Sequence, residues 1–207
     1  METPASRHAH WWAFFRQWLR NPLRTAAVAP SSRDLALAMI SELPPGASRV
    51  IELGGGTGAL TRALLAHGIR GDALLVVELN EELHAHLHAR FPGVYVVLGD
   101  ARSLPELASE CGFLEEGPAD AIVSGLGLLT MPPTLQQEIL KAAFDCLRPD
   151  GVFVQFTYGP AAPVAESVVK QLSLDVHRGD FVLRNMPPAT VYVYSRRPTQ
   201  AAHGAAD

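Results

Sequence analysis

The sequence predicts a single α/β domain built on a Rossmann-like, mostly parallel sheet. Short runs rich in Val, Ile and Leu alternate with helical stretches, which is the pattern of parallel strands that are buried on both faces. A glycine-rich turn joins the first strand to the next helix. A length of 207 residues with 48% hydrophobic residues suits one domain with a full core.

Seven strands are expected, of which the first five are parallel. The parallel strands are predicted at residues 49–53, 73–79, 94–98, 120–124 and 151–157. The helices are predicted at residues 31–43, 59–67, 81–91, 134–147 and 163–172. Two β-type runs, 181–184 and 191–194, have only Pro187-Pro188 and no helix between them, so we expect them to pair antiparallel at the sheet edge. The result is a seven-stranded, mostly parallel sheet with an antiparallel last strand.

Composition divides the chain into an amphipathic segment at 1–30, a globular domain at 31–197 and an Ala/Gly-rich tail at 198–207 that is expected to be disordered. Cys111 and Cys146 lack the spacing of a disulfide scaffold or a metal site and are interpreted as reduced thiols in the cytoplasm. His84 and His88 lie one helical turn apart with no third ligand in view, so no metal is expected. No apolar run reaches the roughly 20 residues of a bilayer span.

Charge is distributed unevenly along the chain. Between Thr3 and Arg33 there are five arginines and no acidic residue, whereas the rest of the chain from Asp34 has 12 basic and 20 acidic residues, a net charge of −8. The basic segment therefore suits an anionic partner, and the acidic body is ill suited to grip a nucleic acid.

The turn after the first strand points to a bound cofactor. Glu52 precedes glycines at 54, 56 and 58, which is the E/D-x-G-x-G-x-G pattern of enzymes that use S-adenosylmethionine. Glu78 ends the second strand, where a carboxylate can accept both ribose hydroxyls, and Asp100 ends the third, where it can accept the adenine amino group or cap the next turn. A nicotinamide enzyme would share Glu78 but not Glu52 and Asp100. Predicted cofactor contacts are Ser31, Ser32, Glu52, Gly54, Gly56, Thr57, Gly58, Glu78, Leu79, Asp100, Ala101 and Ser124.

The fourth strand ends in Ser124-Gly125-Leu126, a small and apolar loop. Enzymes that methylate the amino groups of nucleic-acid bases carry Asn/Asp-Pro-Pro-Tyr or a close variant here, which grips a planar nitrogen. The absence of Asn, Pro and an aromatic ring at this loop argues against a flat base as the acceptor.

The N-terminal segment has the pattern of a helix that lies on a membrane surface. At 100° per residue its aromatic and leucine side chains fall on one arc, and its arginines occupy the opposite face together with Ala13 and Gln17. All three tryptophans of the protein belong to this arc. The alternative is a helix that packs on the body of the enzyme. The residues assigned to membrane contact are Trp11, Trp12, Phe14, Phe15, Arg16, Trp18, Leu19 and Arg20.

These features together resemble the bacterial phospholipid N-methyltransferases of the soluble, peripheral type. The resemblance runs from about Phe14 to Tyr194. It rests on the glycine motif and on the segments Val28-Ala-Pro-Ser-Ser-Arg33, Phe153-Val-Gln-Phe-Thr-Tyr-Gly159 and Arg184-Asn-Met-Pro-Pro-Ala189. Gly55 departs from the family, which often has Pro there. The resemblance implies a class I methyltransferase fold and three methylations of phosphatidylethanolamine to phosphatidylcholine, with S-adenosylhomocysteine as the second product. It also implies a cytoplasmic protein, peripheral on the inner face of the membrane and bound to anionic phospholipid. We expect a monomer in solution.

The acceptor side is predicted at the ends of the fourth and fifth strands. Tyr158 and Ser124 are the candidate catalytic residues; Tyr158 would orient the amine and hold methylated ammonium products by cation–π contact. An ordinary strand-end role for Tyr158 is equally compatible with the sequence. Arg184 would bind the lipid phosphate with help from Asn185, or the two would cap a hairpin. The predicted substrate-binding residues are Gly125, Leu126, Tyr158, Arg184 and Asn185.

Two other functions remain open from the sequence. A ribosomal RNA adenine dimethyltransferase-like enzyme has a similar glycine motif and size, although the acidic body and the Ser124 loop oppose it. A membrane-surface binding module that merely keeps the fold would bind lipid without methylating it.

Overall fold

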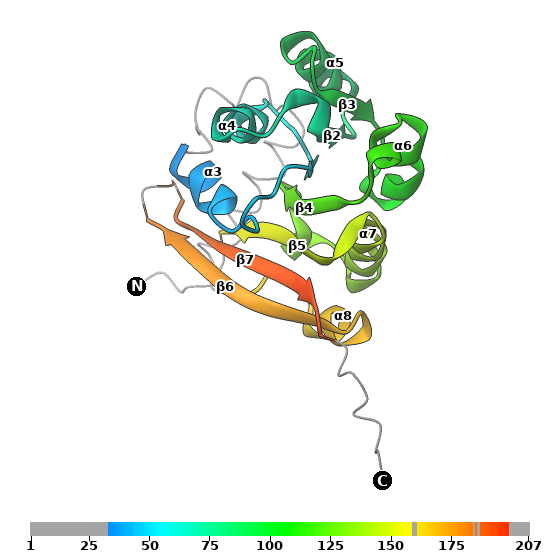
Figure 1. The fold of residues 1–207 in the computed structure, drawn as a ribbon. Coiled ribbons are helices and arrows are strands. Elements are labelled where there is room, and N and C mark those ends of the chain that lie inside the picture. Colours follow the sequence, from blue (N-terminus) through cyan, green and yellow to red (C-terminus); the bar gives the residue numbers. More distant parts are fainter. Residues whose placement is uncertain (1–32, 159–160, 184, 186, 199–207) are drawn as a thin grey trace.

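The computed structural model describes residues 33–158, 161–183, 185 and 187–198, which form one seven-stranded sheet with helices on both faces (Figure 1). The strand order is β3-β2-β1-β4-β5-β7-β6. Strands β1 to β5 run parallel, whereas β7 pairs antiparallel with both β5 and β6. The predicted segment at 1–30 and nearly all of the predicted tail lie outside the described residues. Within the described residues, no helix has the length and apolar character needed to cross a bilayer.

The strands are β1 Val50–Leu53, β2 Leu74–Glu78, β3 Tyr95–Leu98, β4 Ala119–Ser124, β5 Leu147–Thr157, β6 Leu174–Val182 and β7 Ala189–Arg196. The helices are α3 Arg33–Ile40, α4 Ala59–His67, α5 Glu81–Arg90, α6 Leu104–Glu110, α7 Pro133–Asp145 and α8 Glu166–Gln171. The predicted mostly parallel sheet, the antiparallel last strand and the α/β alternation are confirmed.

Strand β6 is where the sequence prediction was least accurate. The prediction placed a short run at 181–184, but the strand begins at Leu174, directly after α8. Its side chains are mostly exposed because β6 is the edge strand, so it carries polar residues that break the apolar pattern of the inner strands. A register shift between Arg178 and Phe181 disturbs the alternation further. Helix α6 was not predicted either, because its seven residues are too few for a periodic pattern.

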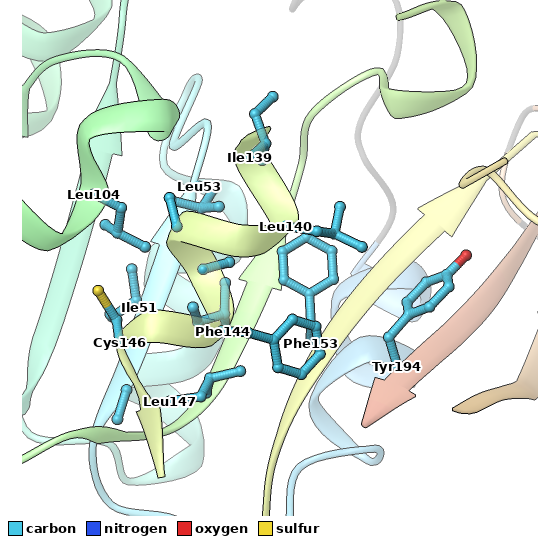
Figure 2. Close-up of a cluster of buried hydrophobic side chains, with 14 of the residues drawn as sticks. Ile51, Leu53, Leu104, Ile139, Leu140, Phe144, Cys146, Leu147, Phe153 and Tyr194 are labelled. Atoms are coloured by element: carbon cyan, nitrogen blue, oxygen red, sulfur yellow. The ribbon is translucent and has the colours of Figure 1, made fainter. Parts of the chain in front are cut away.

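The two faces of the sheet are covered by different helices. Side chains from α6, α7 and α8 pack on one face, and side chains from α3, α4 and α5 pack on the other. Figure 2 shows part of the first cluster, in which Phe153 of β5 lies between Phe144 of α7 and Tyr194 of β7. Complete burial of Ile51 and Phe153 on one face and of Val50 and Val154 on the other means that the middle of the sheet is packed on both faces. The loops at the carboxyl ends of the strands therefore stand on a rigid base.

Candidate active site

The candidate site lies where the strand order reverses, at the carboxyl ends of β1 and β4. Strand β1 pairs with β2 on one side and β4 on the other, so the chain leaves these two neighbouring strands in opposite directions and a crevice opens between their loops. The two loops cross closely, because a Cβ on Gly125 would lie 2.9 Å from the carbonyl oxygen of Gly54. Glycine at 125 is therefore a steric requirement of the crossing.

The glycine turn between β1 and α4 presents bare backbone to this crevice. Gly54, Gly56 and Gly58 have φ of +77°, +54° and +78°, a region that L side chains rarely adopt. A Cβ at Gly58 would also come within 2.5 Å of the Phe91 ring. The predicted spacing of glycines thus corresponds to three positions that need positive φ.

Glu78 lies across the turn, at the end of β2. Its Oε2 accepts a hydrogen bond from the backbone N–H of Gly56 at 2.9 Å, and its Oε1 accepts from the N–H of Asn80 at 2.9 Å. Each carboxylate oxygen has a second lone pair, so both retain the capacity to accept a ligand hydroxyl. The two backbone bonds fix the carboxylate at the edge of the crevice.

Glu52 is buried beneath the glycine turn, on the face covered by α4. Its Oε2 accepts a hydrogen bond from the Thr61 hydroxyl at 2.6 Å. Its Oε1 is buried and has no hydrogen-bond partner among the described residues. Burial raises the pKa of the Glu52 carboxyl from 4.5 to about 8, and the Thr61 bond opposes that rise. A cationic ligand group next to this carboxyl would lower its pKa and favour the ionised form.

Asp100 follows β3 and is held by its neighbour Arg102. Its side chain accepts from the Arg102 backbone N–H at 2.9 Å, and its Oδ2 lies 2.7 Å from Nη2 of the same residue. The Arg102 guanidinium holds the pKa of the Asp100 carboxyl below its usual range. Asp100 therefore caps the short helical turn Ala101–Ser103 and also faces the crevice.

The crevice itself is a cleft of about 570 Å³ that runs from the glycine turn to the start of α7. Its lining is polar beside β2 and β3 and apolar beside β4 and α7. A smaller pocket adjoins it under α3 and shares Gly54, Gly56 and Gly125 with it. The main cleft is lined by Gly54, Gly56, Val77, Glu78, Leu79, Asn80, Leu83, Gly99, Asp100, Ala101, Arg102, Gly125, Leu126, Gly127, Thr130, Met131, Leu135 and Ile139.

A buried amide holds the loop that follows β4. Gln155 of β5 is the register partner of Ser124, and its Nε2 donates to the carbonyl oxygens of Leu126 at 2.9 Å and Phe156 at 2.8 Å. Ser124 is fully buried, and its Oγ accepts from the Leu126 N–H at 3.3 Å. The position of the Leu126 backbone is therefore set by a strand on one side and by the preceding serine on the other.

A second buried amide, that of Gln136 in α7, joins the same loop to the segment after β5. Its Nε2 donates to the carbonyl oxygens of Leu128 at 2.8 Å and Pro163 at 3.2 Å. Its Oε1 accepts from the Ala165 N–H at 2.7 Å. One side chain thus couples the loop after β4, which lines the cleft, to the segment after β5.

Tyr158 and Asn185 meet beside the smaller pocket. Asn185 is buried in the β6–β7 connection, donates to the Pro187 carbonyl at 2.7 Å and shares a hydrogen bond with Tyr158. The Tyr158 ring packs edge-on against Phe156, which lines the pocket, with centroids 5.1 Å apart. Burial raises the pKa of the Tyr158 phenol, against the lowering effect of the Asn185 hydrogen bond. Tyr158 is accordingly a neutral phenol at physiological pH.

Comparison with known proteins identifies the family. Residues 50–151 match the family described as "Methyltransferase domain". An ornithine lipid N-methyltransferase of Singulisphaera acidiphila is 30% identical over 184 residues, which are 86% of this chain and 92% of that protein. The chain belongs to the S-adenosylmethionine-dependent methyltransferases.

Other similarities are shorter or limited to the fold. Ribosomal RNA small subunit methyltransferase A of a Synechococcus strain is 36% identical over 97 residues, which are 44% of this methyltransferase and 31% of that protein. A TehB-like methyltransferase of Corynebacterium glutamicum has a TM-score of 0.59 with 19% identity, covering 91% of this chain and 99% of that one. The glycopeptide N-methyltransferase MtfA complexed with S-adenosylmethionine has a TM-score of 0.61 with 14% identity, covering 80% and 94%.

The cleft of this methyltransferase fits its cofactor. The orphaned Oε1 of Glu52 suits a cationic amino group, the glycine cradle leaves room against the backbone, and Glu78 keeps acceptor capacity for hydroxyls. When bound, S-adenosylmethionine supplies a methyl group activated by a sulfonium. The task of the protein in such a transfer is to hold the methyl donor and the acceptor in line, which is a positioning task.

Eight of the predicted site residues that the structure describes line one cleft, whereas Gly58, Ser124, Tyr158 and Asn185 line neither of the two pockets described above. Glu78, Leu79, Asp100 and Ala101 line it together with the glycine turn and the Ser124 loop, while Glu52 and Thr57 line the adjoining pocket. Asp100 also caps the next turn, the alternative that the sequence left open. Their contacts with cofactor and acceptor stay predictions. The predicted residues that lie outside the described part of the chain are Ser31, Ser32, Arg184, Trp11, Trp12, Phe14, Phe15, Arg16, Trp18, Leu19 and Arg20.

Four polar residues that support the site were not predicted: Thr61, Arg102, Gln136 and Gln155. Gln155 had a signal, since a glutamine inside an otherwise apolar strand buried on both faces needs a partner. Thr61, three residues after Gly58, had a weaker one. The partners of Gln136 lie on two separate loops, so nothing local in the sequence marks it.

Proposed function

We propose that this methyltransferase transfers methyl groups to the amine of a membrane lipid, with phosphatidylethanolamine and its mono- and dimethyl derivatives as acceptors and phosphatidylcholine as the end product. The observation that carries the proposal is the similarity, over 86% of the chain, to an enzyme named for N-methylation of a lipid amine. The family-specific segments after β5 and β6 support it, because they contain Tyr158 and Asn185, which the fold brings together beside the cofactor cleft.

The acceptor side suits an amine that must lose a proton before it reacts. An ethanolamine ammonium with a pKa of about 10 is only about one part in a thousand free amine at pH 7, which adds roughly 4 kcal/mol to the barrier. The apolar lining around Leu126 and Phe156 favours the neutral amine. Tyr158 is a neutral phenol and so is not the proton acceptor; its oxygen orients the nitrogen, and its ring faces the methylated products as a cation–π partner. In the transfer, the nitrogen lone pair forms the new N–C bond, the S–C bond breaks and sulfur keeps its electron pair.

Ornithine lipid is the second candidate acceptor, because the relative just described is named for it. Its terminal amine poses the same protonation problem, but the lipid carries no phosphate. Arg184 would bind the phosphate of phosphatidylethanolamine, whereas ornithine lipid offers it no phosphate. Measuring methylation of the two lipids side by side therefore decides between them.

A ribosomal RNA acceptor is less favoured. The similarity to the RNA enzymes covers 44% of the chain, and the loop after β4 carries Gly125 and Leu126 where amino-methylating enzymes that act on bases carry an Asn-Pro-aromatic pattern. The chain from Asp34 onward also has a net charge of −8. Membrane attachment through the aromatic and arginine-rich segment 11–20 is part of the proposal, since a lipid acceptor stays in its bilayer.

To test the proposal, the protein is incubated with radiolabelled S-adenosylmethionine and one of four acceptors. These are vesicles of phosphatidylethanolamine plus anionic lipid, vesicles of its monomethyl derivative, vesicles of ornithine lipid, and unmodified ribosomal RNA. The proposal expects lipid-extractable label that chromatography resolves into mono-, di- and trimethylated products. Label in ornithine lipid alone would replace the acceptor, and label in RNA alone would overturn the lipid assignment.

The variant Gly54→Val tests whether the protein is an enzyme or only a membrane-binding module. The substitution places a branched side chain at φ +77° and against Leu126, so cofactor binding should be lost while the core stays intact. Methylation should disappear while vesicle binding persists. Retention of full methyl transfer in Gly54→Val would contradict the assignment of the cleft.

A further inference from the structure

Three large apolar side chains are exposed together at one end of the sheet, near the acceptor side. Leu37 of α3 is 47% exposed, Phe181 of β6 is 56% exposed and Leu183, directly after β6, is 71% exposed. All three line one open groove between α3 and the end of β6, and Figure 1 shows these two elements side by side. We call Leu37, Phe181 and Leu183 the tip patch.

The tip patch is exposed because of local geometry. Phe181 and Leu183 are two residues apart, so they point to the same side of the chain, while Val182 between them points into the core. Leu37 lies on the outer side of α3, and its neighbours Leu35, Ala36 and Met39 turn inward. Exposed apolar side chains gathered around one groove mark an interaction surface more often than scattered ones do.

Helix α3 stands between this groove and the proposed acceptor site. Its inner residues Leu35, Ala36 and Met39 line the pocket beside the glycine turn and Phe156, whereas Asp34, Leu37, Ala38 and Ser41 line the groove. The β6–β7 connection likewise contacts both places. Leu183 lines the groove, and the buried Asn185 contacts Tyr158 of the proposed acceptor site. A surface that engages the tip patch therefore lies next to the acceptor site.

Two observations favour a lipid layer as the partner. The segment predicted to lie on a membrane, 1–30, ends three residues before Arg33, which is the first residue of α3 and four residues before Leu37. The described residues that line the groove include two carboxylates, those of Asp34 and Asp180, and no cation. Apolar walls with carboxylates between them complement lipids that carry an ammonium headgroup over acyl chains.

We propose that the tip patch is a second membrane contact, through which the catalytic domain inserts Leu37, Phe181 and Leu183 into the surface of an amine-lipid bilayer. The inference rests on the proposed lipid acceptor and adds where the catalytic domain meets the bilayer. Insertion of the tip patch would bring the pocket lined by Leu35, Met39 and Phe156 beside the lipid layer. The headgroup would then reach this pocket while the acyl chains stay in the membrane. The bilayer face is thereby defined by α3 and the end of β6.

An environment-sensitive dye tests the orientation in the full-length chain. The dye is attached to Leu183→Cys in a Cys111→Ser background, in which Cys146 is buried, and a matched protein carries it at Leu98→Cys on the opposite edge strand β3. With vesicles of phosphatidylethanolamine and phosphatidylglycerol, we expect a blue shift and quenching by brominated lipid at 183 and neither at 98. A dye at 183 that stays water-exposed on sedimented vesicles would overturn the proposal, as would absence of vesicle binding. A dye at 183 that is shielded before vesicles are added would instead assign the groove to the protein's own N-terminal segment.

Activity gives a second readout. Phe181→Asp/Leu183→Asp should raise the KM for bilayer phosphatidylethanolamine at least about tenfold, while activity on a monomeric short-chain analogue stays within about twofold. Val176→Asp, a 46% exposed position at the other end of β6, is the matched control and should change neither. Equal losses on both substrates would contradict a docking role. A protein whose residue 183 enters lipid but which methylates no lipid amine would keep the docking surface and refute the proposed function.

Discussion

At the scale of single residues, Glu52 and Gln155 show how buried polar groups serve the site. The Glu52 carboxyl has one oxygen bonded to Thr61 and one without a partner among the described residues. The Gln155 amide uses both of its N–H groups on loop and strand carbonyls. A buried polar group without its full set of partners is costly, so its retention is best explained by a bound ligand or a positioned loop.

Glu52→Gln should change the pH dependence of stability and weaken cofactor binding. The folded-state pKa of Glu52 is raised from 4.5 to about 8, so between these values the folded protein holds a proton that the unfolded chain releases. The cofactor-free protein should therefore lose stability as pH rises through that window, and the variant should lose less. Thermal unfolding from pH 5 to 9 measures this; parallel curves would contradict it. Calorimetry should give a Kd for S-adenosylmethionine at least about tenfold higher in the variant.

Gln155→Met should impair the acceptor side more than the cofactor side. The substitution removes both donors and leaves the Leu126 carbonyl without its partner on β5, at a cost of about 1–3 kcal/mol. We expect kcat/KM for the lipid amine to fall at least about tenfold while the Kd for S-adenosylmethionine stays within about threefold. Gln171→Met, an exposed glutamine at the end of α8, is the control. A parallel loss of both parameters would show that Gln155 is merely structural.

At the scale of elements, strand β5 positions residues on which the site depends. β5 lies between the parallel strand β4 and the antiparallel strand β7. It supplies Gln155 to the β4 loop and ends at Thr157, one residue before Tyr158. The side chain of Phe153 is fully buried between Phe144 and Tyr194 (Figure 2). Packing of β5 and geometry of the acceptor side are therefore linked.

Phe153→Ala should destabilise the protein by about 3–5 kcal/mol, because a large cavity would open in the cluster packed between the sheet and α7. For a domain of this size the unfolding midpoint should fall by about 10 °C or more. Differential scanning calorimetry measures the change. Leu98→Ala, at a 42% exposed position, should stay within about 1 °C. A small effect of Phe153→Ala would mean that the cluster collapses around the cavity.

At the scale of the whole molecule, the N-terminal segment is basic, whereas the part of the chain that forms the cleft is acidic. The first 33 residues carry five arginines and the rest carries a net charge of −8. A body with this charge is repelled by an anionic surface, so the proposed attachment would depend on the N-terminal arginines and on apolar insertion. The proposal therefore predicts that binding is sensitive to the anionic lipid content of the membrane.

Arg16→Ala/Arg20→Ala should weaken binding to anionic vesicles by roughly 2 kcal/mol, or about thirtyfold, because each arginine near such a surface contributes about 1 kcal/mol. Co-sedimentation at fixed ionic strength gives the partition constant, and the difference should shrink as salt is raised. Arg62→Ala/Arg70→Ala removes the same charge from exposed positions on the body and is the control. Equal losses in both double variants would show that only net charge matters.

The sequence by itself determined the α/β alternation, the parallel direction of the first five strands and the positions of the glycine turn, Glu78 and Asp100. These features are local, because apolar periodicity, glycines that need positive φ and acids at strand ends are all set within a few residues. Helix α4 was predicted at its observed bounds for the same reason.

Only the tertiary structure decided which polar groups support the site and which apolar groups remain exposed. Gln136 reaches Leu128 and Pro163 across gaps of 8 and 27 residues, and Gln155 reaches Leu126 across 29. The edge strand β6 has no apolar period to predict it, since its side chains between the buried ends Leu174 and Val182 are nearly all exposed. Whether Phe181 and Leu183 are core or surface likewise depends on what packs over them. Such contacts join distant parts of the chain, so no local pattern determines them.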